Sequence, residues 1–371
     1  MSEALSHVLR AREVGFRLKD LGWQVSHVAS DAAASRLTGA GISFHSRGIP
    51  WRWGHNRYGV VDQTDFYTET CRHLESALKE LRPDVVIGIP GIASFQVCRK
   101  LGIPHHSILH GPWLSPLIPT RGADSLPGEV GALTAMNATL AGPVSEQLRL
   151  QSRSLGITET DYKDFLQFEN ILVSHTGLEF TPSANLIPLE SITADYGPTE
   201  LPAAIGAPES LACITFGSAV RFDAQSLVEQ LEAVCDRVLV VGRGATVAKP
   251  GPKVVQVDKF NTISLARQSS IVVCHGGIGT VASVMSCGTP VVCIPNDVDQ
   301  AVNSIVADRM GQGQTVGLSA WRTRNPAGRE FPAVDSAEIG SAVRRALDAG
   351  EYAPVRSEGA LQVARYLHTQ R

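Results

Sequence analysis

The sequence has 371 residues, of which 43% are hydrophobic, and a formal net charge of −3. A chain of this length buries a large core and is expected to form two domains. Its near-balanced charge excludes the basic field of a nucleic-acid-binding protein, and its seven scattered cysteines favour free thiols over a disulfide framework. No run of about 18 apolar residues is present, so we predict no transmembrane helix and expect a cytoplasmic protein.

The first predicted element is a helix. Apolar residues recur at helical spacing from Val8 to Leu21, Ser6 is a candidate N-cap, and Gly22 ends the pattern. A strand is expected from Trp23 to Ala29. A doubly wound sheet normally places a strand before its first helix, but only five residues precede this cap. Either the sheet lacks that strand or the reading frame starts upstream of Met1, and we favour the upstream start.

Alternating helices and strands follow. The expected elements are a helix over 65–81, a strand over 83–89, a helix over 93–101, a strand over 105–109, a loop over 111–133, a helix over 135–155 and a strand over 171–174. Such αβ units with short connections are typical of a parallel sheet.

A stretch rich in Pro, Thr and Gly over 188–208 predicts a linker, after which the αβ alternation restarts. The later elements are strands over 212–216, 237–241 and 254–257, helices over 224–234, 262–267 and 301–310, and two closing helices. We place an N-terminal domain at 1–198, the linker at 199–208, a C-terminal domain at 209–350 and a helical tail at 351–371. Two α/β halves joined in this way predict a ligand in the cleft between them.

A glycine-rich turn dominates the second half. An apolar strand over 271–274 runs into His275 and a glycine cluster, and a helix follows that is closed by Gly288 and Pro290. A second apolar strand over 291–294 then leads into a polar loop. In a strand–turn–helix unit of this kind, backbone N–H groups can bind an anion.

Two ligand classes fit the turn when it is taken alone. The residues 277–282 match the dinucleotide pattern G-x-G-x-x-A, with Asp297 or Asp299 about 20 residues further on. The late position of the unit and the leading His275 argue against a dinucleotide. An imidazole beside helix-terminal N–H groups is suited to stabilising the charge on a departing diphosphate. Asp297 and Asp299 also form a D-x-D triplet, but no further carboxylate is near in sequence, and we expect no metal.

The pattern strand-HGG-x-GT-helix-GTP-VV-x-IP-x₄-Q-x₂-N resembles the nucleotide-sugar signature of GT-B glycosyltransferases. It is most similar to the UDP-glycosyltransferase and antibiotic macrolide glycosyltransferase family, with kinship to the peptidoglycan N-acetylglucosaminyltransferase. The resemblance is strong over 212–313, where the run 214–218 (Ile-Thr-Phe-Gly-Ser) opens it and Asp299, Gln300 and Asn303 close it. The first half matches weakly in sequence but in the same order of elements.

The resemblance implies roles for individual residues. The diphosphate would be bound by Ser218, His275, Gly276, Gly277, Gly279 and Thr280, the donor sugar by Asp299 and Gln300, and the base by the loop of Phe260, Asn261 and Thr262. Residues 6–10 are similar to the family's G-H-x-x-R turn, with His7 as general base, although Ser6 replaces the glycine. An imidazole at this place is suited to removing a hydroxyl proton near neutral pH. Arg10, His110 and Trp113 are acceptor-side candidates.

The sequence therefore predicts an α/β protein with two Rossmann-like, doubly wound domains and an inter-domain cleft. The implied activity is inverting transfer of a sugar from a UDP- or dTDP-sugar co-substrate to a hydroxyl of a small-molecule acceptor, without a metal or cofactor. The alternatives are a non-catalytic nucleotide-sugar-binding helper, an NAD-dependent oxidoreductase that uses the glycine turn, and a sugar-nucleotide epimerase.

Overall fold

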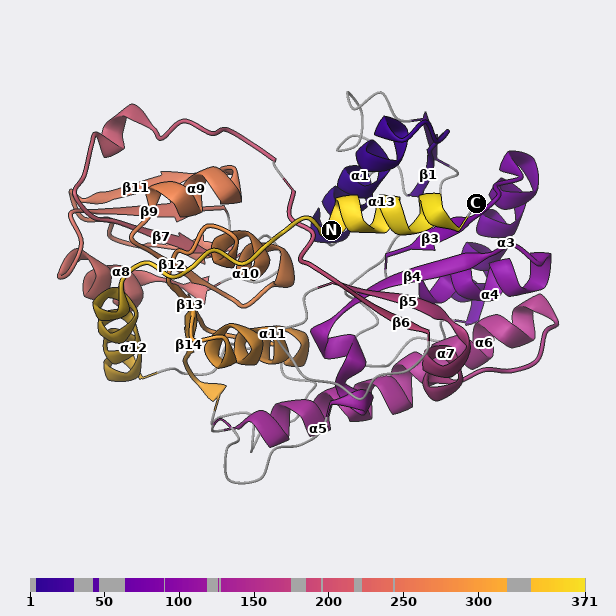
Figure 1. The fold of residues 1–371 in the computed structure, drawn as a ribbon. Coiled ribbons are helices and arrows are strands. Elements are labelled where there is room, and N and C mark those ends of the chain that lie inside the picture. Colours follow the sequence, from indigo (N-terminus) through magenta and orange to yellow (C-terminus); the bar gives the residue numbers. More distant parts are fainter. Residues whose placement is uncertain are drawn as a thin grey trace. The chain divides into compact units, whose positions relative to one another are not determined.

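The structure is a computed structural model that describes residues 5–29, 43–46, 64–89, 91–118, 126, 128–174, 185–194, 196–216, 222–242, 244–318 and 335–370. The chain forms two compact units (Figure 1). Unit 1 comprises Met1–Pro119, Met136–Ile192 and Glu358–Arg371, and unit 2 comprises Thr120–Ala135 and Thr193–Ser357. The last helix, which the sequence suggested as a separate tail, thus belongs to unit 1, and a short segment of the first half belongs to unit 2.

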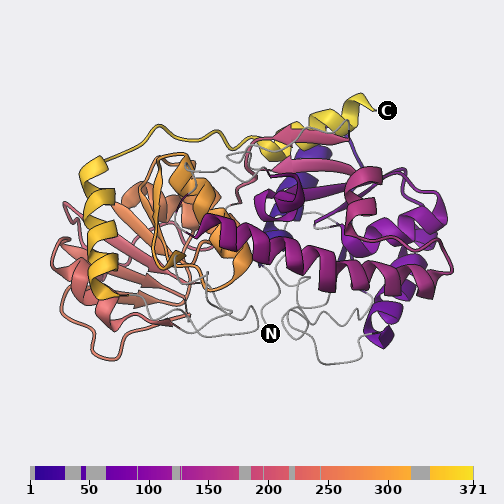
Figure 2. The ribbon, with the colours of Figure 1, turned by 90° about the horizontal axis from the view of Figure 1, so that it is seen from below.

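Unit 1 combines parallel strands with helices. Its elements are α1 (Leu5–Asp20), β1 (Ser26–Ala29), β2 (Ser43–Ser46), α3 (Thr64–Leu81), β3 (Val86–Gly88), α4 (Ile92–Leu101), β4 (His105–His110), the 3-10 helix η1 (Gly111–Leu117), the π-helical η2 (Leu140–Val144), α6 (Ser145–Leu155), α7 (Tyr162–Phe168), β5 (Asn170–Ser174), β6 (Leu186–Leu189) and α13 (Gly359–Thr369). Helix α5 (Glu129–Thr139) begins in unit 2 and runs through η2 into α6 as one helical stretch (Figure 2).

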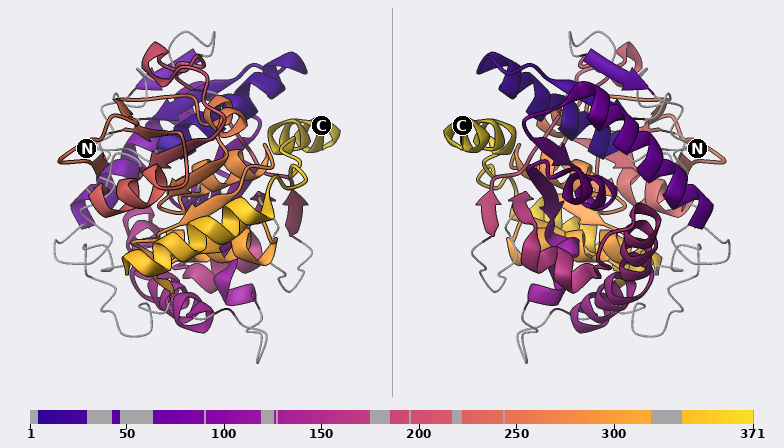
Figure 3. Two further views of the ribbon diagram at one scale, coloured as in Figure 1. Left: turned by 90° about the vertical axis from the view of Figure 1, so that its left-hand side faces the viewer. Right: turned by 90° about the vertical axis from the view of Figure 1, so that its right-hand side faces the viewer.

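The main sheet of unit 1 has the parallel order β3-β4-β5-β6, and β1 pairs with β2 in a separate parallel sheet. The part of the chain that the structure describes contains no strand before α1. Helix α13 packs against α1 (Figure 3), and both contribute to one apolar cluster with β4, β5 and β6. The first and last helices of the described chain therefore share a core.

Unit 2 is a doubly wound α/β unit. Its elements are η3 (Ala203–Ile205), β7 (Leu211–Thr215), β8 (Phe222–Asp223), α8 (Gln225–Glu232), β9 (Arg237–Val241), β10 (Ala245–Thr246), β11 (Val254–Val257), α9 (Thr262–Gln268), β12 (Ile271–Cys274), α10 (Ile278–Met285), β13 (Val291–Cys293), α11 (Val298–Arg309), β14 (Gly313–Thr315) and α12 (Ser336–Ala349). Six strands form a parallel sheet of order β11-β9-β7-β12-β13-β14.

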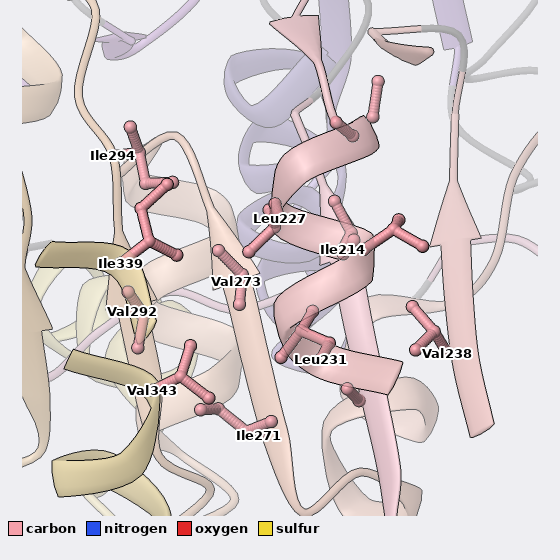
Figure 4. Close-up of a cluster of buried hydrophobic side chains, with 14 of the residues drawn as sticks. Ile214, Leu227, Leu231, Val238, Ile271, Val273, Val292, Ile294, Ile339 and Val343 are labelled. Atoms are coloured by element: carbon pink, nitrogen blue, oxygen red, sulfur yellow. The ribbon is translucent and has the colours of Figure 1, made fainter. Parts of the chain in front are cut away.

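Helices cover both faces of this sheet because its strands alternate apolar residues to either side. Leu227 and Leu231 of α8 pack with Ile339 and Val343 of α12 on one face (Figure 4). Residues of α9 and α10 pack with Val272 on the other face. This two-sided burial fixes the register of β12, the strand that leads into the glycine turn.

Most predicted elements are confirmed, and the differences are local. The expected 188–208 linker begins too early, since Pro188 lies in β6 and η3 lies within 203–205. The expected 111–133 loop contains η1 and the start of α5. Helix α7 and the strands β2, β6, β8, β10 and β14 are not predicted from the sequence, and α11 starts at Val298 rather than near Ala301. All seven cysteines are free, and six of them are buried. Among the described residues, no helix is long and apolar enough to cross a membrane.

Candidate functional site

The glycine turn lies at the reversal of strand order in unit 2. The next strand of this sheet along the chain after β7 is β9, which pairs with β7 on one side. Strand β12, which comes later in the chain, pairs with β7 on the other side. The carboxyl ends of β7 and β12 therefore flank a topological switch point, where open α/β sheets bind their ligands. His275 directly follows β12, and α10 begins three residues later.

Two glycines shape the turn. Gly276 has a φ of +81°, and a Cβ there would stand 2.4 Å from the Ser304 hydroxyl of α11. Gly277 lies under the His275 imidazole, so that a Cβ on it would stand 2.5 Å from the ring Nε2 atom. Any side chain at either position would displace the turn or the ring. The glycine requirement thus comes from close packing, against α11 at Gly276 and against the His275 ring at Gly277.

The start of α10 presents backbone donors. Gly277 is the N-cap and provides no side-chain hydrogen bond, while Thr280 and Val281 donate their N–H groups back to the Gly277 carbonyl. The N–H groups of the preceding residues, Ile278 and Gly279, have no acceptor one turn earlier within the helix. Together with the helix dipole, these N–H groups make the first turn of α10 suited to an anion.

His275 is half-buried, between the turn and the end of β7. Its ring centroid is 6.4 Å from that of Phe216, which stacks on Phe222 at 4.2 Å. Phe216 and Phe222 form an apolar wall on one side of the ring and partly exclude water from it. Electrostatic interactions of the ring are therefore stronger than they would be in bulk water.

Beneath the turn, two thiols meet across adjacent strands. The Sγ atoms of Cys274 and Cys293 are 3.9 Å apart, and the N–H of Gly276 donates to the Cys274 Sγ atom at 3.4 Å. The Cys293 thiol and this N–H group lower the pKa of Cys274, against the effect of burial. Sequence reasoning missed this contact, because strand register decides which cysteines become neighbours.

Polar residues at the start of α11 are joined by hydrogen bonds. Asp297 caps the helix by accepting the N–H of Gln300 at 2.9 Å. The Gln300 side chain accepts the N–H of Asn296 at 3.0 Å and donates to Asp297 at 3.0 Å. Asp299, in the first turn, is half-buried. The Gln300 amide is thus used within its own loop. Asp297, for which the sequence pattern indicates only a dinucleotide or a metal, is a structural helix cap.

The predicted base-binding loop is partly occupied with structural roles. Phe260 is buried in an apolar core cluster of unit 2. Asn261 is buried as well, and its side chain caps α9 by accepting the N–H of Ser264 at 2.9 Å. Thr262, the first residue of α9, is half-buried. Backbone groups of this loop, rather than the ring of Phe260, are therefore the better candidates for contact with a base.

The remaining predicted site residues that the structure describes lie in unit 1. Ser218 is outside the described residues. His7 is half-buried in α1 of unit 1, with its ring centroid 6.1 Å from that of His110. The Arg10 Nη1 atom is 3.4 Å from the His110 Nδ1 atom, and both side chains are buried.

Trp113 is also buried, and its carbonyl accepts the Tyr162 hydroxyl at 2.6 Å. The structure therefore brings His7, Arg10 and His110 together, but places Trp113 in a different contact.

No cluster of three metal-ligating side chains occurs within the ranges that the structure describes. Asp297 and Asp299 belong to the cap and first turn of α11, without a third carboxylate or histidine in such a group. The described site therefore offers backbone N–H groups and an imidazole as its anion-binding groups.

Known proteins resemble this chain over part or all of its length. Residues 246–313 match the glycosyltransferase family 28 C-terminal domain. The PGL/p-HBAD biosynthesis rhamnosyltransferase of Mycobacterium bovis (strain BCG / Pasteur 1173P2) is 24% identical over an alignment that covers 93% of this chain and 82% of that protein. A PGL/p-HBAD biosynthesis glycosyltransferase of Mycobacterium tuberculosis (strain ATCC 25177 / H37Ra) is 30% identical over 23% of this chain and 20% of its own.

Solved structures resemble the whole chain. The glycotransferase of kitacinnamycin has a TM-score of 0.65 at 19% identity and covers 99% of this chain and 96% of its own. SnogD from Streptomyces nogalater has a TM-score of 0.61 at 20% identity, with 99% and 96% covered. VinC, solved in complex with DTDP, has a TM-score of 0.61 at 16% identity, with 98% and 97% covered. At these identities the likeness concerns the fold.

Proposed function

We propose that this chain, a glycosyltransferase of the GT-B type, transfers a sugar from a nucleoside-diphosphate sugar to a hydroxyl of a small molecule. The observation that carries the proposal is the turn of unit 2, in which His275 and the N-terminus of α10 converge at the switch point of the sheet. The proposed occupant of this turn is the diphosphate of the donor.

In this mechanism the turn acts on the leaving group. As the bond to the anomeric carbon breaks, negative charge grows on the diphosphate. The N–H groups of Ile278 and Gly279 and the imidazole of His275 stabilise that charge more strongly than the charge of the bound donor, which lowers the barrier. Fixed donors do not have to reorient during the reaction, because the hydrogen bonds of Thr280 and Val281 to the Gly277 carbonyl hold the start of α10.

The donor is proposed to be a thymidine- or uridine-diphosphate sugar. A rhamnosyltransferase among the relatives and the DTDP complex of VinC favour a dTDP-linked deoxyhexose. Asp299, half-buried in the first turn of α11, is the proposed acceptor for sugar hydroxyls. Gln300 supports it by holding the loop of Asn296 and Asp297.

The acceptor side of the proposal rests on unit 1. His7 is the proposed general base that removes the proton of the attacking hydroxyl, and attack from the face opposite the leaving group inverts the anomeric carbon. Arg10 and His110 are proposed to position His7, since the three groups lie together. Ser218 stays a predicted diphosphate ligand, and the proposal needs no metal or redox cofactor.

The test combines donor binding with transfer. Calorimetric titration with UDP, dTDP and their sugars should give saturable binding, and mass spectrometry should detect a glycosylated product with a panel of hydroxylated small molecules. Binding without transfer to any acceptor would favour the non-catalytic helper. Enhanced NADH fluorescence on mixing, with no binding of either diphosphate, would favour the oxidoreductase.

A further inference from the structure

A second group of reactive side chains lies in unit 1. Ser94 is in the first turn of α4, His105 opens β4, and Glu169 lies between α7 and β5. The Ser94 Oγ atom is 2.8 Å from the His105 Nε2 atom, and the His105 Nδ1 atom is 2.7 Å from a Glu169 carboxylate oxygen. These two distances join a hydroxyl, an imidazole and a carboxylate in series.

The order of the three groups sets the proton positions. His105 and Glu169 are both buried, and a buried ionised carboxylate requires a donor. The N–H at Nδ1 of His105 supplies that donor, which leaves the Nε2 lone pair to accept the Ser94 hydroxyl. Ser94 also approaches the Gly91 carbonyl, but at the longer distance of 3.2 Å. The shorter contact is the one that activates a nucleophile.

We propose that Ser94, His105 and Glu169 form a hydrolytic centre in unit 1 that cleaves small, uncharged carboxylic esters, independently of sugar transfer. Serine hydrolases work by this arrangement of nucleophile, base and orienting carboxylate, which is recognised by geometry rather than by fold. Of the three residues, only Ser94 is partly exposed, as a nucleophile must be.

The reaction balances with water as the only co-substrate. The Ser94 Oγ atom forms a bond to the ester carbonyl carbon while its proton passes to the His105 Nε2 atom. The bond from that carbon to the alcohol oxygen then breaks, and His105 returns the proton to the alcohol. Water next attacks the acyl group on Ser94 and gives its proton to His105. The bond from the acyl carbon to the Ser94 Oγ atom then breaks, His105 returns the proton to that atom, and the carboxylic acid leaves.

The surroundings decide the class of ester. The tetrahedral oxyanion needs donors, and α4 begins after Gly91 with no side-chain cap, so its first N–H groups are available. Phe95 is buried beside the centre, with its ring centroid 6.2 Å from that of His105. Space is narrow, because a Cβ at Gly88 would stand 2.7 Å from the Ser94 Oγ atom. A short, uncharged acyl group such as acetyl suits this site.

The experiment labels the intact protein with a fluorophosphonate probe and follows hydrolysis of p-nitrophenyl acetate. We expect a covalent adduct on the peptide that contains Ser94, and a hydrolysis rate that falls by roughly 10²-fold or more in Ser94→Ala and in His105→Gln. Ser107→Ala is the matched control. Ser107 lies two residues from His105 in the same strand, is fully buried, and its side chain makes no hydrogen bond to the described residues.

A second variant separates chemistry from folding. In Ser94→Cys the thiol keeps its place beside His105, so iodoacetamide should alkylate it faster than it alkylates any native cysteine, six of which are buried. The proposal would be overturned if the probe formed no adduct on Ser94 and the thiol of the Ser94→Cys variant were unreactive. The hydrogen bonds among Ser94, His105 and Glu169 would then be purely structural. Sugar transfer should be the same in Ser94→Ala as in the parent chain, so the outcome is independent of the proposed sugar transfer.

Discussion

The imidazole of His275 lies against the backbone of Gly277, close enough that a Cβ on Gly277 would stand 2.5 Å from the ring Nε2 atom. Because of this contact, the position of the His275 ring, which we propose binds the diphosphate, depends on the absence of a side chain at Gly277. The ring cannot swing toward the turn without striking the helix N-cap, so its direction is fixed by β12 and α10 together.

Replacing Gly277 by alanine tests that dependence. The added methyl should push the ring out of place, and since a displacement of about 1 Å can lower a rate about 10²-fold, kcat/KM for the donor should fall by roughly this factor. Gly142→Ala is the control, because a Cβ there meets nothing within 4 Å. Steady-state kinetics of both variants check the prediction. Equal kcat/KM values in the two would contradict it.

Substitution of His7 tests the acceptor side of the proposed mechanism, which rests on unit 1. His7→Ala should lower the transfer rate by roughly 10²- to 10⁴-fold, as loss of a general base does, while donor affinity stays the same, since the proposed donor site is in unit 2. Transfer assays and calorimetric titration with dTDP measure the two quantities separately. A variant that keeps the parent rate would remove His7 from the mechanism.

The half-buried His27 and the buried His106 predict loss of stability in acid. Burial lowers the pKa of His27 to about 4, and burial together with the neighbouring His105 lowers the pKa of His106 to about 4. Because the unfolded chain has a pKa near 6.5 at these sites, it binds more protons than the folded chain between about pH 4 and 6.5. The contribution of these two histidines to the free energy of unfolding is therefore full above about pH 6.5. It falls as the pH drops toward 4, by up to about 1.4 kcal/mol per pH unit for each histidine.

Denaturant unfolding at about pH 7 and about pH 4.5 checks the sign of this effect. The chain should be less stable at the lower pH, and His106→Gln should lose less stability over the same interval. His368→Gln, on the exposed side of α13, serves as the control and should follow the parent chain. If the His106→Gln variant and the parent lose equal amounts, His106 is not a source of the acid sensitivity.

We expect the ion pair of Arg309 and Glu129 to stabilise unit 2. Arg309 of α11 contacts the carboxylate of Glu129, whose side chain is only 1% exposed and also accepts the N–H of Leu126 at 3.0 Å. Arg309→Met should destabilise unit 2 by about 3–5 kcal/mol, because it leaves a buried carboxylate without its cation. Arg153→Met, which breaks the exposed pair with Glu159, is the control and should leave the unfolding transition unshifted. Chemical denaturation of both variants measures the difference, and equal midpoints would contradict it.

Local patterns in the sequence predict the elements around the glycine turn well. Apolar runs and glycines place β12, the turn and α10. The predicted GT-B fold is confirmed by the similar structures, and the matching glycosyltransferase domain and the relatives support the predicted activity. The roles of His275, Gly279 and Thr280 in binding a diphosphate stay predictions. Residue type and spacing suffice for these elements because their determinants lie close together along the chain.

Contacts between distant residues were beyond such patterns. His105 and Glu169 are 64 residues apart, and Arg309 and Glu129 are 180 apart, so only the completed packing brings these side chains together. The cap of α11 was missed for a different reason. Asp297 was considered as a ligand, although an aspartate three residues before a helical Gln300 is also a good N-cap, and tertiary packing decides which role it takes.

The most direct test of the central claim is the turnover of His275→Ala with saturating nucleotide sugar and an accepted hydroxyl substrate. Measured beside the parent chain, kcat should fall by roughly 10²-fold or more, because one group that stabilises the leaving diphosphate is lost. A folded variant with unchanged kcat would contradict the assignment of the glycine turn of unit 2 as the diphosphate site.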